Sequence, residues 1–414
     1  MKARIDKLYF YLLCLFAFSI PFAGFHIPKY VLGGLILLKI FIIIKDVKDF
    51  QSIVIKKKKV LMALLICPIS ISITMLYSTD TVTGLSLLGR YSFCFILPFV
   101  FLVKNDNKVL VYSVLSYAAG AFALILLNFI LIVVKWDEPV FYSYSKFYYQ
   151  NLSSYVALHP GYYSLIISSA LFVILVYLKS KIKLLAVSLC AIILFLLSSK
   201  GIIILSFVGI AVWLYHNTIK QKNRFRNISG WIILSFFLSF FLTQTHIFKR
   251  IKQSYISFQN VSSVYEDPNN RLDENLLRFF LFKYSIDTIK KNNYSALFGY
   301  GIGDYQKELL TTYEEEKYGF GLHYRYNSHN QYLTTTLMSG IVGLIIFIVY
   351  LLTPIIFGNM ENVLSGIFVL ILFGYAFLES YFSREIGILI SSFFITILSM
   401  LQLRCSKKHQ KFIM

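Results

Sequence analysis

The sequence predicts an all-α polytopic membrane protein with about twelve transmembrane helices and one large outer loop that contains short helices. Of its 414 residues, 57% are hydrophobic and only 14% are charged, and the mean hydropathy is +0.67. A water-soluble core does not bury that much apolar surface. Apolar runs of about 20 residues, the length that crosses about 30 Å of hydrocarbon as a helix, also recur along the chain.

The apolar runs follow one another closely through most of the chain. In chain order, the predicted spans are 8–25, 28–44, 60–77, 88–103, 109–134, 160–178, 184–198, 201–215, 229–245, 331–356, 363–379 and 386–403. The first run could instead be a signal peptide, because three basic residues precede it and Ala17-Phe18-Ser19 resembles a cleavage site. We interpret it as a membrane helix.

The basic residues are distributed unevenly between the two ends of these helices. The chain holds 40 Lys and Arg against 20 Asp and Glu, a net charge of +20. If the N-terminus is cytoplasmic and the helices alternate, the cytoplasmic segments hold 22 basic and five acidic residues, and the short outer loops hold six basic residues. This asymmetry follows the positive-inside rule, so we predict that both termini are cytoplasmic. Membrane orientation therefore explains the positive charge. In a soluble chain the same charge would suggest nucleic-acid binding.

The cysteines give no sign of a disulfide framework or a metal site. Cys14, Cys67, Cys94 and Cys190 lie within apolar runs, and Cys405 lies in the C-terminal tail. The sequence has no Cys-x-x-Cys pair and no metal-ligand spacing. It therefore predicts neither a bound metal nor a cofactor.

One connection is much longer than the others. Residues 246–330 form a loop between the membrane helices of 1–245 and the last three helices and tail of 331–414. The loop holds eleven basic and ten acidic residues, and long loops are exempt from the positive-inside rule. Within it, 276–289 repeats apolar residues at helical spacing, which predicts a helix. A loop longer than about 15 residues is usually functional or disordered, and this pattern favours a folded, functional one.

Two segments in the C-terminal part of this loop have a recognisable pattern of residues. The glycine-rich segment 297–304 follows a helix and lacks the Lys-Ser/Thr of a phosphate-binding loop, so we expect a tight turn close to the membrane surface. Segment 326–333 places His329 at the outer end of the helix that begins at 331. An imidazole titrating near pH 6.5 is the commonest general base. The alternative for His329 is a structural residue that caps the helix.

Five segments form a recognisable pattern. They are an arginine-led amphipathic helix in the long loop, Gly301-x-Gly303-Asp304, Ser328-His329-Asn330-x-Tyr332-Leu333, Gly340-x-x-Gly343-Leu344 and, more weakly, Ser198-Ser199-Lys200-Gly201. With these segments the chain resembles the O-antigen ligase/polymerase superfamily of bacterial envelopes. The resemblance extends from about 271 to 350, and the His-Asn motif with its context is its most specific part.

The resemblance implies metal-independent glycosyl transfer on the periplasmic face of the bacterial inner membrane, with a glycan on undecaprenyl diphosphate as the donor. By position, His329 would be the base that activates the acceptor hydroxyl, with Asn330 as a secondary candidate. Arg278 would grip the diphosphate. Lys200 falls where many members have an arginine, so a point charge replaces a bidentate fork. Arg271 is a further candidate for the diphosphate, and a solvated loop charge is its alternative.

Other residues are secondary candidates, and each has a structural alternative. His159 begins an outer-facing helix, where packing at the helix start is the alternative. Glu379 and Arg384 bracket the last outer turn and could form a structural pair, although a lipid diphosphate would lie at that level. Arg325 could be a solvated loop charge, and Arg90 could extend its side chain to the interface.

The leading hypothesis is a ligase that attaches the glycan to lipid A–core. The same chemistry suits a polymerase, whose acceptor is a second lipid-linked repeat, or a ligase that glycosylates Ser or Thr of a protein. From a different class, a flippase for the same lipid-linked oligosaccharide is the alternative. Transporters place polar groups at the bilayer midplane, whereas here Lys39 is the main charge inside a predicted span. We therefore expect a donor, an acceptor and membrane lipids as partners, and no nucleic acid.

Overall fold

The computed structural model describes residues 2–103, 106–134, 147–178, 182–220, 274–358 and 362–401. These residues form α-helices and short 3₁₀-helices, and no strand occurs among them. Up to residue 220 the elements are α1 (Lys2–Ser19), η1 (Ile20–Phe25), α2 (Ile27–Lys45), α3 (Val47–Lys56), α4 (Lys58–Ile73), η2 (Thr74–Tyr77), α5 (Thr81–Val100), α6 (Asp106–Val134), α7 (Tyr149–Ser154), α8 (Pro160–Tyr177), α9 (Ile182–Leu197) and α10 (Lys200–Lys220). After residue 273 they are α14 (Glu274–Lys290), α15 (Asn293–Phe298), α16 (Tyr305–Glu315), α17 (Gly319–Tyr324), α18 (Gln331–Ile356), α19 (Val363–Leu378), η5 (Tyr381–Ser383) and α20 (Glu385–Met400).

Eight of the described helices are long and apolar enough to cross a membrane, namely α1, α2, α4, α5, α6, α8, α10 and α18. The helices α9, α19 and α20 are apolar but shorter. Eleven of the twelve predicted spans coincide with these helices, and the predicted span 229–245 lies outside the described residues. The predicted fold class, an all-α polytopic membrane protein, is confirmed.

The predicted span 88–103 differs from the observed helix by seven residues at its start. Helix α5 begins at Thr81, because the Asp80 side chain accepts hydrogen bonds from the Thr83 backbone N–H (2.9 Å) and hydroxyl (2.7 Å). This is a typical N-cap. The first turns of α5 contain Thr, Gly and Ser, so the apolar run alone does not reveal where the helix begins.

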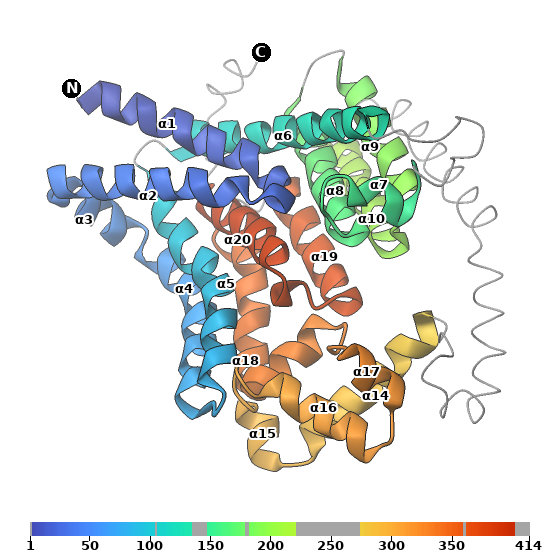
Figure 1. The fold of residues 1–414 in the computed structure, drawn as a ribbon. Coiled ribbons are helices and arrows are strands. Elements are labelled where there is room, and N and C mark those ends of the chain that lie inside the picture. Colours follow the sequence, from blue (N-terminus) through green and yellow to red (C-terminus); the bar gives the residue numbers. More distant parts are fainter. Residues whose placement is uncertain are drawn as a thin grey trace.

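The helices form three groups around a centre (Figure 1). Helices α1, α2 and α6 lie side by side at one end, whereas α4, α5 and α18 run together in a different direction. Helices α8, α9 and α10 form the third group. Helices α19 and α20 contact members of several groups and lie between them.

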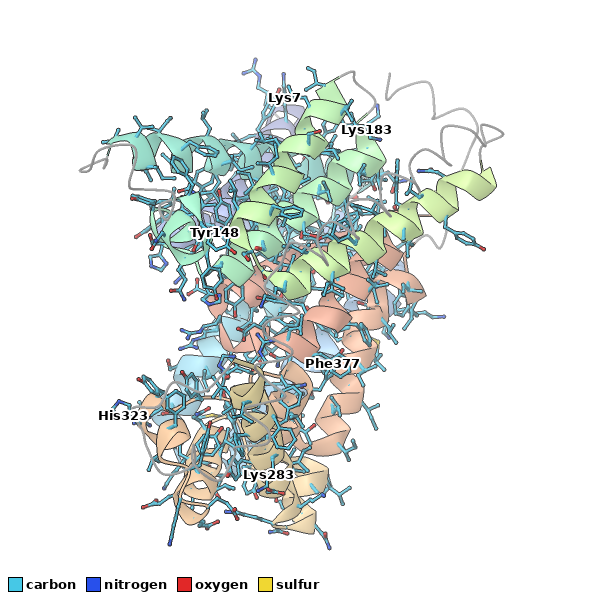
Figure 2. The ribbon with its side chains drawn as sticks, turned by 90° about the vertical axis from the view of Figure 1, so that its right-hand side faces the viewer. Lys7, Tyr148, Lys183, Lys283, His323 and Phe377 are labelled. Carbon is cyan, nitrogen blue, oxygen red and sulfur yellow. The ribbon has the colours of Figure 1, made fainter. Side chains whose placement is uncertain are left out.

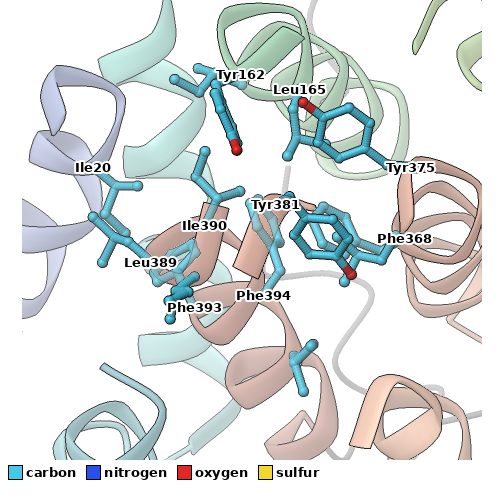
Figure 3. Close-up of a cluster of buried hydrophobic side chains, with 14 of the residues drawn as sticks. Ile20, Tyr162, Leu165, Phe368, Tyr375, Tyr381, Leu389, Ile390, Phe393 and Phe394 are labelled. Atoms are coloured by element: carbon cyan, nitrogen blue, oxygen red, sulfur yellow. The ribbon is translucent and has the colours of Figure 1, made fainter. Parts of the chain in front are cut away.

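The core is built around α8, α19 and α20. Almost every residue of α8 and α20 is buried, and a helix that is apolar on all sides belongs in an interior. Figure 3 shows Tyr162 of α8, Phe368 and Tyr375 of α19 and Phe394 of α20 around one centre. The rings of Phe368 and Phe394 stack with centroids 4.1 Å apart, and Tyr162 meets Tyr375 edge to face at 6.2 Å. This core supports the turn that connects α19 to α20.

The described part of the long loop is folded. Helix α14 confirms the helix predicted over 276–289. It packs on α16 and on Tyr318, the residue before α17, through stacked, tilted and edge-to-face rings of Phe280, Tyr284, Tyr313 and Tyr318, whose centroids are 5.1–6.1 Å apart. The Thr288 hydroxyl donates to the Thr312 hydroxyl at 2.7 Å within the same interface. Buried aromatic contacts therefore hold the loop helices together.

The glycine-rich turn fits into a break in α18. Gly340 has φ 65° and ψ −169°, so the helix is interrupted there. The N–H groups of Tyr300 and Gly301 donate to Leu337 O (2.8 Å) and Met338 O (3.0 Å), near the interruption. A Cβ on Gly340 would lie 2.1 Å from the Leu297 carbonyl group. Only glycine permits this conformation and this approach.

Asp304, at the end of the same turn, attaches the loop to the connection between η2 and α5. Its carboxylate accepts hydrogen bonds from the N–H of Thr79 (2.6 Å), the Thr79 hydroxyl (2.8 Å) and the N–H of Asp80 (3.0 Å). Burial would raise the pKa of Asp304, but these three bonds hold it below the ordinary value. The Gly-x-Gly-Asp turn is therefore a structural clamp, and protein groups occupy its hydrogen-bonding positions.

Candidate active site

His329 lies at the junction between the loop and α18 in an unusual conformation. Its φ of 43° lies in the left-handed region, which costs about 1–2 kcal/mol in a residue other than glycine. The Asn327 side chain accepts a hydrogen bond from the His329 N–H at 3.0 Å. Asn330 is the N-cap, and its side-chain oxygen accepts from the Leu333 N–H at 3.0 Å. Asn330 thus has the capping role, and the imidazole projects from the strained residue before it.

A buried hydrogen-bond network holds this junction against the turn between α19 and α20. Ser328 shares a hydrogen bond with Thr334 (2.6 Å), and Thr334 shares one with Ser380 (2.8 Å). The Gln331 side chain accepts from the Phe382 N–H at 2.8 Å. All four polar side chains are at least 98% buried, and satisfied buried networks fix geometry. The sequence analysis did not assign this role to Ser328 or Gln331, although both lie beside His329.

The network brings His329 next to Glu379. Nδ1 of His329 lies 3.1 Å from Oε2 of Glu379, and the two side chains are 28% and 19% exposed. Burial would raise the pKa of Glu379, but the hydrogen bond from His329 and the charges of His329, His159 and Arg278 hold it below the ordinary value. An ionised carboxylate only accepts hydrogen bonds, so Nδ1 donates to it, and when the imidazole is neutral its lone pair is on Nε2.

A cavity of about 890 Å³ opens beside this pair. Six of the predicted site residues line it, namely Arg90, His159, Arg325, His329, Glu379 and Arg384. The sequence analysis missed several other lining residues, among them Tyr162, Tyr305, Gln306, Tyr324, Tyr326, Asn327 and Glu385. The volume falls within the range of small-molecule sites. Its lining combines aromatic rings, cations and one carboxylate–imidazole pair, which suits a polar substrate such as a sugar.

Several cavity residues also have structural contacts. Nδ1 of His159 accepts a hydrogen bond from the Gly161 N–H at 3.2 Å and caps α8, so His159 has the structural role that was its alternative and also lines the cavity. Nη1 of Arg90 donates to Ser383 O at 2.6 Å and connects α5 to the α19–α20 turn. Arg325 is exposed and ends α17 with φ 50°. Glu379 pairs with His329, which lies 50 residues earlier in the sequence.

Lys200 and Arg278 approach the same turn without lining the cavity. Lys200 begins α10, and a Cβ on its neighbour Gly201 would lie 2.0 Å from Cδ1 of Leu378. Leu378 ends α19 and directly precedes Glu379, so Lys200 lies beside the end of that helix. Arg278 in α14 acts electrostatically on Glu379. Arg271 lies outside the described residues.

The end of α19 is therefore the meeting point of distant parts of the chain. Figure 2 shows Phe377 between the loop region, marked by Lys283 and His323, and the region marked by Tyr148 and Lys183. The Tyr148 hydroxyl donates to Ser198 at 2.7 Å, beside the start of α10. Across the described residues, no three His, Cys, Asp or Glu side chains come together to form a group that could hold a metal ion.

A comparison with protein families found a match for part of the chain. Residues 185–348 match the family model described as O-antigen ligase. The match confirms the predicted resemblance to the O-antigen ligase superfamily over these residues. The matched residues include Lys200, Arg278 and His329, and the match extends the predicted resemblance towards the N-terminus. Glu379 lies beyond it. No protein in the curated set matches the chain.

The family and the apolar helices together describe the protein at a general level. It is a multi-pass membrane protein with a ligase/polymerase-type function of the O-antigen ligase superfamily. Such a function implies a lipid-linked glycan and an acceptor as partners.

Proposed function

We propose that the protein transfers a glycan from undecaprenyl diphosphate to an acceptor hydroxyl on the periplasmic face of the inner membrane, with lipid A–core as the acceptor. The observation that carries this proposal is the His329–Glu379 pair in the wall of a cavity of about 890 Å³. A base oriented by a carboxylate, next to space for a sugar, suits the activation of a hydroxyl group.

In the proposed reaction the acceptor hydroxyl lies against Nε2 of His329. As its oxygen forms a bond with the anomeric carbon of the donor, the bond from that carbon to the diphosphate oxygen breaks. The electron pair leaves with undecaprenyl diphosphate, and the hydroxyl proton moves to His329. Glu379 stabilises the resulting imidazolium. A general base of this kind contributes about 10²–10⁴-fold to the rate.

Arg278 and Lys200 would hold the diphosphate in this proposal. The charge of Arg278 reaches Glu379, and Lys200 begins α10 beside the end of α19. Cations at one spot can stabilise the leaving group without protonating it, and an interfacial site of low dielectric strengthens each contact. We propose that these side chains do so without a metal ion.

The surroundings of Lys39 favour this function over transport. Lys39 is the main charge inside a predicted span, and its ammonium group donates to Leu102 O at 2.6 Å. It also lies 5.1 Å from the centre of the Tyr9 ring. A buried lysine with these partners serves packing between helices. The clustered ionisable residues lie around the cavity, which suits chemistry at one face.

We further propose that 1–245, 246–330 and 331–414 are functional units, with both termini cytoplasmic.

The experiment that tests this function uses the purified full-length protein in lipid nanodiscs with labelled undecaprenyl-diphosphate-linked glycan. Lipid A–core and a second lipid-linked repeat are offered in competition, with and without a chelator. We expect labelled lipid A–core at the same rate in both conditions. A labelled lipid-linked dimer would instead identify a polymerase, and the absence of transfer to either acceptor would contradict the proposal.

A further inference from the structure

A second hollow lies between α2 and α5. It has a volume of about 460 Å³. At one end, Nζ of Lys29 and Oε2 of Glu385 form an ion pair at 2.7 Å. The remaining lining residues are Leu32, Gly33, Ile36, Ser86, Gly89, Arg90, Ser92 and Phe93. We refer to this hollow as the α2–α5 groove.

The α2–α5 groove adjoins the cavity at His329. Arg90 and Glu385 line both hollows. Arg90 also donates to Ser383 O, so it joins α5 to the cavity wall. A molecule could therefore occupy the groove and the cavity at the same time, with its charged or polar part near Arg90.

The groove is open where two glycines face it. A Cβ placed on Gly33 or Gly89 would meet no atom within 4 Å. Leu32, Ile36 and Phe93 add apolar surface. On the same helices, Leu37 is 70% and Leu85 is 61% exposed, as expected for side chains that face lipid. The groove thus lies in lipid-facing surface, and its apolar walls suit a hydrocarbon chain.

We infer that the α2–α5 groove seats the hydrocarbon chain of a lipid-anchored acceptor, whose saccharide enters the cavity past Arg90 and presents its hydroxyl to His329. This inference rests on the proposed function and selects an acceptor class: a lipid-linked saccharide, not a protein. The geometry favours the acceptor over the donor, because Lys200 and Arg278 lie on α10 and α14. Figure 1 shows these helices on the opposite side of α19 from α2 and α5.

The test fills the groove in the full-length protein. Gly33→Leu and Gly89→Leu place a side chain in open space, and leucine favours a helix more than glycine does, so both variants should fold. Gly34→Leu is the matched control, because a Cβ on Gly34 also meets no atom within 4 Å and Gly34 does not line the groove. The KM values for the donor and for the acceptor are measured with undecaprenyl-diphosphate-linked glycan and, in separate arms, lipid A–core or a lipid-linked repeat.

We expect the KM for the lipid-anchored acceptor to rise about 15-fold in both groove variants, because a leucine displaces about two methylene groups of the chain and each contributes about fourfold to affinity. The Gly34→Leu control should keep the wild-type KM. Unchanged acceptor KM values would overturn the inference. A rise in the donor KM alone would also overturn it. If the wild type transfers glycan to nothing, the proposed function itself fails.

Discussion

Two carboxylates on the loop side of the molecule have contrasting partners. Asp304 accepts hydrogen bonds from two backbone N–H groups and one hydroxyl, which join the loop to the start of α5. Glu379 faces His329, His159 and Arg278, and it lines the cavity. Both carboxyl groups have a lowered pKa, but hydrogen-bond donors cause the shift at Asp304 and titratable or cationic side chains contribute at Glu379. The comparison indicates that the partners of a carboxylate, not its pKa alone, distinguish a clamp from a reactive centre.

The largest effect is expected at the partner of Glu379. His329→Ala should leave the protein folded and inserted but slow glycan transfer by about 10²–10⁴-fold, because the base is lost. The transfer rate of purified protein is the measurement. His323→Ala is the matched control, since His323 is an exposed residue of α17 that does not line the cavity. Near-normal transfer by His329→Ala would exclude the general-base role.

Substitutions of Lys200 test whether the cations beside Glu379 stabilise the leaving diphosphate. Lys200→Ala should lose about 2–4 kcal/mol of transition-state stabilisation, a rate decrease of about 30- to 1,000-fold. Lys200→Arg should retain transfer, because the charge is kept. The rates of both variants are measured with saturating acceptor. Equal rates for wild type and Lys200→Ala would remove Lys200 from the donor site.

Glu379→Gln tests how much the charge of the carboxylate contributes to the His329–Glu379 pair. The amide keeps the shape of the side chain but loses the charge that stabilises the imidazolium, and a hydrogen bond to a charged group contributes about 1.5–3 kcal/mol. We expect kcat to fall about 10- to 100-fold, with the thermal unfolding midpoint little changed. If Glu379→Gln instead lowers the thermal unfolding midpoint as much as the substitution Asp304→Asn does, Glu379 is structural.

Asp304→Asn should have the smallest effect on transfer and a visible effect on stability. Losing charge-assisted hydrogen bonds at a buried site costs about 1–3 kcal/mol of unfolding free energy, whereas the folded fraction should transfer glycan normally. Because the pKa of Asp304 is lowered on folding, its contribution is present above the unfolded pKa of about 3.9 and is lost as pH falls through the folded pKa. Acid unfolding of wild type and variant measures this. Equal acid sensitivity would contradict the clamp.

Much of the fold could be predicted because periodicity and apolar length are local properties. The helix over 276–289 and the position of His329 before α18 follow from such patterns. The break at Gly340 could not be predicted, because a glycine in an apolar run does not reveal its φ. It depends on the approach of Leu297, which lies more than 40 residues away.

The site could be predicted only in part for the same reason. The spacing of Glu379 and Arg384 in one turn suggests a pair, yet Glu379 meets His329 because Ser328, Thr334 and Ser380 connect two distant segments. The α2–α5 groove also escapes sequence analysis, since Gly33 and Gly89 come together only in the folded helices.

The most direct test of the account is a double-mutant cycle on His329 and Glu379. The transfer rates of wild type, His329→Ala, Glu379→Gln and the double variant are compared under one set of conditions. If Glu379 acts through the imidazole, the double variant should be no slower than His329→Ala alone. If Glu379→Gln slows the His329→Ala protein by the same factor as it slows the wild type, the two residues act independently and the proposed pair is wrong.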